Sequence, residues 1–208
     1  MAIASLSKFT VPLATNQSAS AQGMLMPKLK YRFRVTFEGF GAAAGGTATT
    51  ELTKQVISAV RPNVQFANQV IEVYNSKVNY AGKHTWQTMA ISLRDDATGN
   101  VSKLVGEQLQ KQFDFMEQSS AASAMDYKFL TRIEILDGGN GADAANILET
   151  WECYGCYLTQ VNYQNLAYGE QGPVQIDLTI QPDNCLQKPD GTGVGVVVAR
   201  TLGTMATG

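Results

Sequence analysis

Strict alternation of apolar and polar residues, in two segments far apart in the chain, restricts the fold more than any other feature. From residue 31 to 38, tyrosine, phenylalanine and valine alternate with arginine, threonine and glutamate, and residues 174–181 repeat the pattern with Val, Ile and Leu against Gln, Asp and Thr. A period of two is typical of a β-strand with one buried face. The same reasoning predicts strands over 85–94, 127–136 and 147–161, and Gly155 marks a bulge in the last of them. It also predicts a hairpin over 70–80 that turns near Asn75-Ser76, followed by a turn at Ala81-Gly82.

One segment, residues 100–118, has helical periodicity instead. Its apolar residues recur at spacings of three and four and cover a broad face: Val101, Leu104, Val105, Leu109, Phe113 and Met116. We expect Asn100 to cap this helix. Gln108 and Gln112 fall near the middle of the apolar face, and buried amides must find hydrogen-bond partners. We therefore expect the helix to lie between its own sheet and a neighbouring subunit, with Gln108, Gln112, Phe115 and Met116 as interface candidates.

These patterns predict a mainly β fold: two packed antiparallel sheets, as a sandwich or barrel, with one flanking α-helix and a long loop at about 41–62. The second face of each strand is polar, which indicates a sheet with a solvent-facing side. The predicted organisation is an N-terminal arm (1–26), a β-domain (27–187) and a C-terminal arm (188–208). We expect the arms to be held by contacts with another copy of the chain.

Composition excludes several functions. A chain of 208 residues with a net charge of −2 lacks the basic surface that binding a phosphate backbone requires. Its apolar runs are shorter than the ~20 residues of a membrane-spanning helix, so no membrane anchor is expected.

The chemistry-bearing residues do not predict an active site. His84 is the only histidine, which argues against a catalytic triad or zinc site. Cys153 and Cys156 form a CxxC motif, but it lies in a predicted strand, so we expect these two and Cys185 to be reduced and partly buried. Asp95-Asp96 fits the positive end of the following helix better than a cation site. No catalytic residue, metal or cofactor is expected, and the chain is predicted not to be an enzyme.

Several stretches together resemble the tail tube proteins of contractile-tailed bacteriophages. The resemblance covers roughly residues 28–186 and rests on the order and spacing of these motifs: YRFRV at 31–35, LRDD at 93–96 before VSKL at 101–104, QLQKQ at 108–112, DYKF at 126–129, IEILDG at 133–138, LETW at 148–151 through Gly155-Cys156, IDLTI at 176–180 and Asp183-Asn184.

The resemblance implies a structural subunit of a virion tail, assembled in the host cytoplasm. Six copies would form a ring, and stacked rings would form a tube inside a contractile sheath. The implied partners are further copies of the chain, the sheath protein, baseplate and tail terminator proteins, and a tape measure protein followed by DNA in the lumen. The long loop, with Leu52 and Val56, would reach the adjacent ring. We expect Gln175, Asp177, Thr179 and Gln181 to face the lumen.

Three alternatives stay open. The chain could be a tube subunit of a related contractile injection system, of the pyocin-like or type VI secretion kind, which shares the fold and differs in cargo. It could be a soluble ligand-binding β-sandwich, which predicts a monomer with an aromatic cleft. A β-scaffold hydrolase would need a nucleophile–base pair, which the single histidine makes improbable.

Overall fold

A computed structural model of the chain describes residues 27–41, 49–138, 145–188 and 193–195. The two predicted arms, 1–26 and nearly all of 188–208, lie outside the described residues, so the expectation that they contact another copy stays a prediction. In order, the elements are β1 (Phe33–Glu38), α1 (Thr50–Gln55), β2 (Val56–Ala59), β3 (Val64–Val73), β4 (Ser76–Trp86), β5 (Met89–Arg94), α2 (Asn100–Gln112), β6 (Phe113–Asp114), β7 (Ser119–Ser120), α3 (Ala124–Tyr127), β8 (Phe129–Leu136), β9 (Ile147–Asn162), β10 (Gln175–Gln181) and β11 (Asn184–Lys188).

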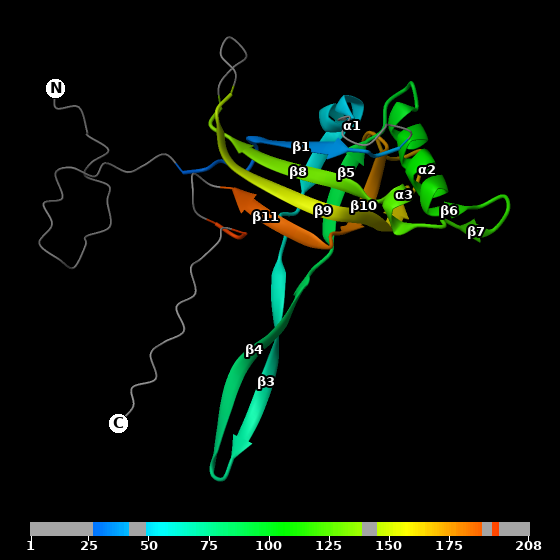
Figure 1. Ribbon diagram of the computed structural model, residues 1–208. Coiled ribbons are helices and arrows are strands. Elements are labelled where there is room, and N and C mark those ends of the chain that lie inside the picture. The colour runs from blue at the N-terminus through cyan, green and yellow to red at the C-terminus, as the bar shows by residue number, and fades with distance from the viewer. Residues whose placement is uncertain (1–26, 42–48, 139–144, 189–192, 196–208) are drawn as a thin grey trace, which may run out of the picture.

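Two antiparallel layers share one long strand, β9, so the predicted mainly β, two-layer architecture is confirmed (Figure 1). The first half of β9 pairs with β8 and β11, and β8 pairs in turn with β1. The second half pairs with β10, which continues through β5 to β2. We call β1–β8–β9–β11 the front layer and β9–β10–β5–β2 the back layer.

Gly155 allows β9 to bend between the two layers. Its φ is +65°, in the region that favours glycine, and the ladder to β8 shifts register here. A Cβ atom at this position would lie 2.8 Å from Cγ of Asp183, so a larger residue does not fit. The bulge predicted at Gly155 is therefore confirmed.

The core lies between the layers and is built from the inward-facing residues of the alternating strands. Its fully buried large side chains come mainly from β1, β5 and β10: Val35, Phe37, Met89, Ile91, Leu93, Ile176, Leu178 and Ile180. Phe40 and Phe129 pack edge to face, with ring centroids 4.9 Å apart. Helix α2 contributes Val101 and Val105 to the same core.

The helix is shorter than predicted and has a different cap. It ends at Gln112 because Phe113 is extended, at φ −151°, and begins the short β6–β7 hairpin. Gly99, at φ +67°, occupies the N-cap position without a side-chain bond. The Asp96 carboxylate instead accepts a hydrogen bond from the backbone N–H of Asn100 at 3.2 Å. The prediction that Asn100 caps the helix is wrong, and Asp96 has the role expected of a carboxylate before a helix.

Other local predictions are also corrected. The predicted long loop at 41–62 contains α1 and β2, and the backbone N–H of Thr49 joins it to the Phe37 carbonyl of β1 at 2.8 Å. Residues 42–48 of that segment lie outside the described residues. No turn occurs at Ala81-Gly82, because β4 runs through these residues and only shifts its register against β3. Tyr127 belongs to α3, not to β8, and the described residues form three helices where one was predicted.

None of the helices in the described part of the chain is long and apolar enough to cross a membrane.

Candidate assembly interface

The β3–β4 hairpin projects away from the two-layer body (Figure 1). Every described residue from Gln65 to Thr85 is exposed except Gly82, which is half-buried. The hairpin turns at Tyr74-Asn75, one residue before the predicted Asn75-Ser76, and its strands are 10 and 11 residues long. An isolated two-stranded hairpin is at best marginally stable in water. A further surface to pack on would therefore stabilise this hairpin.

The two faces of the hairpin differ in polarity. The cross-strand pairs Ile71–Val78 and Val73–Ser76, together with Tyr80, lie on one face. Four large apolar side chains on that face are about half exposed: Ile71 52%, Val73 48%, Val78 53% and Tyr80 51%. We call these four residues the hairpin apolar face.

The opposite face of the hairpin is mainly polar. Lys77 and Glu72 form an ion pair at 3.1 Å, and the Asn68 amide donates to the Asn79 side-chain oxygen at 3.3 Å. The large apolar residues on this face are Val70 and, nearer the body, Phe66, so the face is mainly polar toward the tip of the hairpin. Contiguous exposed apolar side chains mark interaction surfaces, whereas a polar face suits solvent. The polarity difference therefore indicates which face of the hairpin would contact a partner.

A groove of about 850 Å³ separates the two edge strands, β1 and β2. We call it the β1–β2 groove; residues 28–35, 56–59, Ile133 and Ile135 contribute to its lining. Within the described residues β1 pairs only with β8, and its Phe37 carbonyl accepts from Thr49 on the other side. The alternation of a strand then directs the backbone groups of Phe33 and Val35 toward the groove. Such an edge can accept an additional strand.

The predicted lumen residues lie along the outward face of β10. Gln175, Asp177, Thr179 and Gln181 are half-buried and alternate with fully buried neighbours. The Ser92 hydroxyl on β5 donates to Asp177 at 2.6 Å, and Gln164 also donates to this carboxylate. Their other cross-strand neighbours are Ala90 and Arg94 of β5 and Tyr157, Gln160 and Asn162 of β9. This face of the back layer is thus polar, with one acid and one base.

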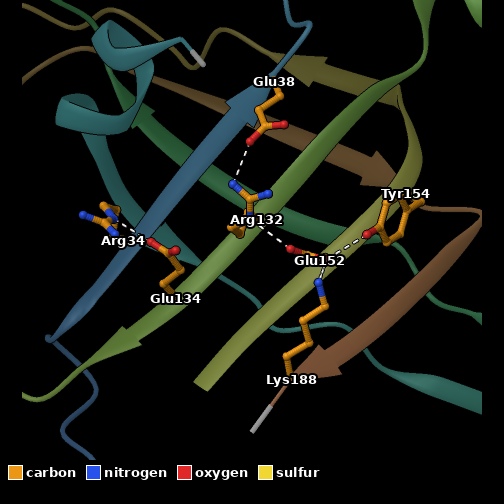
Figure 2. A network of polar contacts seen from close by, with 7 residues as sticks. All are labelled: Arg34, Glu38, Arg132, Glu134, Glu152, Tyr154 and Lys188. Atoms are coloured by element: carbon orange, nitrogen blue, oxygen red, sulfur yellow. Dashed lines mark hydrogen bonds and ion pairs between the residues drawn. The ribbon is translucent and has the colours of Figure 1, made fainter. Parts of the chain in front are cut away.

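The outward face of the front layer is instead covered by ion pairs (Figure 2). Arg132 of β8 bonds Glu38 of β1 at 2.6 Å and Glu152 of β9 at 3.3 Å. Glu152 also accepts from Lys188 at 2.6 Å and from the Tyr154 hydroxyl at 2.7 Å. Beside them, Arg34 bonds Glu134 at 2.6 Å. The charges on this layer are therefore balanced by partners on neighbouring strands.

These contacts lower the pKa of the Glu152 carboxyl. Burial acts to raise its pKa, but the hydrogen bonds from Lys188 and Tyr154 and the nearby positive charges outweigh burial and hold the pKa below its ordinary value. Glu152 therefore stays ionised as the centre of the network.

The two amides expected at a subunit interface are satisfied within the chain. Gln108 is fully buried; it accepts from the Gly41 N–H at 3.0 Å and donates to the Tyr127 carbonyl at 2.6 Å. Gln112 donates to the Leu158 carbonyl at 3.0 Å and accepts from the Leu158 N–H at 2.9 Å. The argument that these amides need a neighbouring subunit is wrong, because backbone groups of the same chain, in α3, in β9 and at Gly41, supply their partners. Leu52 is likewise fully buried in the core.

Three of the predicted interface residues remain available at the surface. Phe115 and Met116, 61% and 91% exposed, lie in the turn of the β6–β7 hairpin. Val56 is half-buried beside the β1–β2 groove. The hairpin apolar face and the groove were missed from the sequence, although the alternation at Ile71, Val73, Val78 and Tyr80 was the signal that could have revealed the former.

The residues considered for chemistry occupy structural positions. His84 is exposed on β4, with its ring between those of Phe66 and Trp86. Cys153, Cys156 and Cys185 are free thiols, fully buried and not half-buried as predicted. Among the described residues, no group of three or more His, Cys, Asp or Glu side chains is arranged to hold a metal ion.

Comparison with known proteins gives a consistent structural result. Neither a protein-family model nor a curated protein matches the sequence. Among solved structures, a chain of the tube-terminating cap of the anti-feeding prophage aligns with a TM-score of 0.59 and 13% identity, over 84% of this chain and 99% of that one. A chain of the PVC sheath–tube complex in its extended state gives 0.53 and 13%, over 78% and 92%. The SPP1 tail tube gives 0.51 and 11%, over 79% and 80%.

The chain has the tail tube fold. At these identities the similarity is one of fold, so function has to be argued from the surfaces described above.

Proposed function

We propose that this chain is the structural subunit of a phage tail tube, in which hexameric rings stack into a hollow tube inside a contractile sheath and the genome passes through the lumen. The observation that carries the proposal is the β3–β4 hairpin, which extends from the body with an exposed apolar face. A surface of this kind requires a partner, and repeated copies of the same chain are the partner that a tube supplies.

The edges of the sheets support the same assembly. Both β1 and β2 pair on one side only, in the described part of the chain, and lie beside an open groove. Exposed strand edges promote pairing with other chains, and a closed ring of subunits would cover them. In this proposal, back layers of neighbouring subunits join into a continuous barrel wall.

The polar face of β10 suits the wall of that barrel. Gln175, Asp177, Thr179 and Gln181 present amide, hydroxyl and carboxylate groups with few positive charges. Such a wall does not bind phosphates tightly, so DNA could slide along it without being held. The ion-paired front layer would then face outward, toward the sheath protein.

The further partners follow from the tube. A sheath protein would surround it, baseplate and terminator proteins would close its ends, and a tape measure protein would precede DNA in the lumen. The tube would be assembled in the host cytoplasm and then belong to the virion tail.

A second candidate is a tube subunit of a contractile injection system that carries a different cargo. The similarity to the anti-feeding prophage and PVC structures favours this alternative. The two functions share the assembly and differ in whether the particles contain DNA.

Electron microscopy of the purified full chain, with particle mass measured by ultracentrifugation, tests the proposal. We expect six-fold rings or hollow tubes. Ile71→Asp places a charge on the hairpin apolar face and should abolish them, whereas Asn79→Asp adds the same charge on the polar face and should leave them intact. A wild-type chain that stays monomeric at high concentration, even with tail components present, would refute the assembly.

A further inference from the structure

We propose that Cys153 and Cys185 form an oxidation site, a pair of buried thiols that a two-electron oxidant such as hydrogen peroxide converts into a disulfide between β9 and β11. The proposal rests on the strand register and does not depend on the proposed function. In a reducing compartment the two side chains stay thiols, and outside the cell an oxidant can cross-link them.

The register places the two cysteines opposite each other. Cys185 of β11 pairs directly with Cys153 of β9, and both side chains are fully buried in the core. Directly opposed residues of antiparallel strands have Cα atoms roughly 4.5–5.5 Å apart, and disulfides join Cα atoms roughly 4.4–6.8 Å apart. The interaction with the Cys185 thiol is also the largest effect that raises the pKa of Cys153. The bond therefore needs only a small approach of the two strands.

Cys156 is not a suitable partner, although it completes the CxxC motif. Because of the bulge, Cys153 and Cys156 lie opposite Thr131 and Phe129, two residues apart on β8, which corresponds to about 7 Å between Cα atoms and is at the upper limit for a disulfide. A disulfide cannot bridge Cα atoms more than about 7 Å apart without movement of the backbone. The Cys156 thiol instead lies 3.2 Å from the Cys153 carbonyl oxygen, to which it donates. The pattern that suggests a redox pair in the sequence is thus not the pair that the fold brings together.

Access to the thiols is through β11. This strand has five residues and pairs with β9 on one side, while the Gln187 N–H reaches the Val194 carbonyl on the other at 2.8 Å. A short strand at a sheet edge opens at lower cost than the whole domain unfolds. Burial also raises the pKa of the neighbouring Cys156 to about 12, so thiols in this part of the core are poorly ionised until the strand opens. Oxidation should therefore be slower than that of a free thiol.

The reaction balances with one peroxide molecule. When β11 opens, the Cys185 thiolate attacks a peroxide oxygen; an S–O bond forms, the O–O bond breaks, and the departing hydroxide takes up a proton to become water. As β11 returns, the Cys153 sulfur attacks the Cys185 sulfur, the S–O bond breaks, and the second oxygen leaves as water with the remaining thiol proton. Two thiols lose two electrons, and the peroxide gains them.

Peptide mapping of the native full chain after treatment with hydrogen peroxide tests this site. Cleavage before aspartate separates Cys185, in fragment 183–189, from Cys153 and Cys156, in fragment 143–176. We expect one disulfide-linked pair of these fragments, lost on reduction. The link should persist in Cys156→Ala and disappear in both Cys153→Ala and Cys185→Ala, with circular dichroism confirming that each variant is folded.

Two results would overturn the proposal. One is a disulfide that joins Cys153 to Cys156 or Cys156 to Cys185 in the native protein. The other is a native chain that forms no link between the two fragments under conditions in which the chain, unfolded in urea, forms disulfides readily.

Discussion

Replacing Gln108 with leucine should destabilise the subunit strongly, although the substitution puts an apolar residue into an apolar core. The Gln108 amide accepts from the Gly41 N–H at 3.0 Å and donates to the Tyr127 carbonyl at 2.6 Å. Leucine would leave both backbone groups without these partners, and each unsatisfied buried group costs about 1–3 kcal/mol. The added apolar surface offsets part of this loss, so we expect the free energy of unfolding to fall by about 2–4 kcal/mol.

Thermal unfolding followed by circular dichroism measures this effect. For a chain of this size, about 2–4 kcal/mol should lower the Tm by roughly 5–15 °C. The measurement requires protein that ultracentrifugation shows to be monomeric, because assembly would add stability that depends on concentration. Gln110→Leu is the matched control, since Gln110 is exposed on the same helix and bonds only the Asp114 side chain. Its effect should stay within about 0.5 kcal/mol. Equal Tm values for both variants would refute the role assigned to Gln108.

Three further predictions concern the bulge, the ion-pair network and the channel wall. Gly155→Ala should lower the free energy of unfolding by about 2–4 kcal/mol, because alanine is strained at φ +65° and its Cβ would meet Asp183. Urea denaturation of the monomer measures this change, and an unchanged midpoint would contradict the bulge geometry. The lowered pKa of Glu152 contributes stability that is fully present above the ordinary glutamate pKa of about 4.5 and is lost as the pH falls through the folded-state value. Glu152→Gln should therefore flatten the acid limb of a curve of Tm against pH. An unchanged acid limb would exclude this carboxyl as a source of the pH dependence. Asp177→Lys should leave tubes assembled but slow DNA ejection from particles, because it adds a phosphate-binding cation to the proposed wall; unaffected ejection would count against a luminal β10 face.

The strands with strict alternation could be predicted from the sequence because a strand with one buried face has an apolar residue at every second position. Phe33–Glu38 and Gln175–Gln181 lie where the pattern indicates, whereas the strand predicted over 85–94 is divided between the end of β4 and β5, Met89–Arg94. The five-residue β11 was missed because Asn184–Lys188 is too short to establish a period. In residues 42–62, the many small residues gave no clear period, so α1 and β2 were not predicted. Contacts with β1 and β5 hold these two elements in place.

The surfaces were harder to predict than the core. The sequence indicates that Gln108 and Gln112 must find partners, but only the fold shows that Gly41, Tyr127 and Leu158 provide them. The hairpin apolar face was hidden for a related reason, since Ile71 and Val78 have the pattern of an ordinary strand pair. Only the fold shows that these residues lie beyond the body of the domain, where there is no core for them to cover.

The strand β9 has a mechanical consequence. Its 16 residues belong to both layers, so one continuous covalent backbone connects the front layer to the back layer. A force applied to β8 or β11 would reach β10 as shear along β9, loading many ladder hydrogen bonds at once instead of peeling the layers apart one contact at a time. A subunit built in this way resists sliding between its layers by the tensile strength of a single chain.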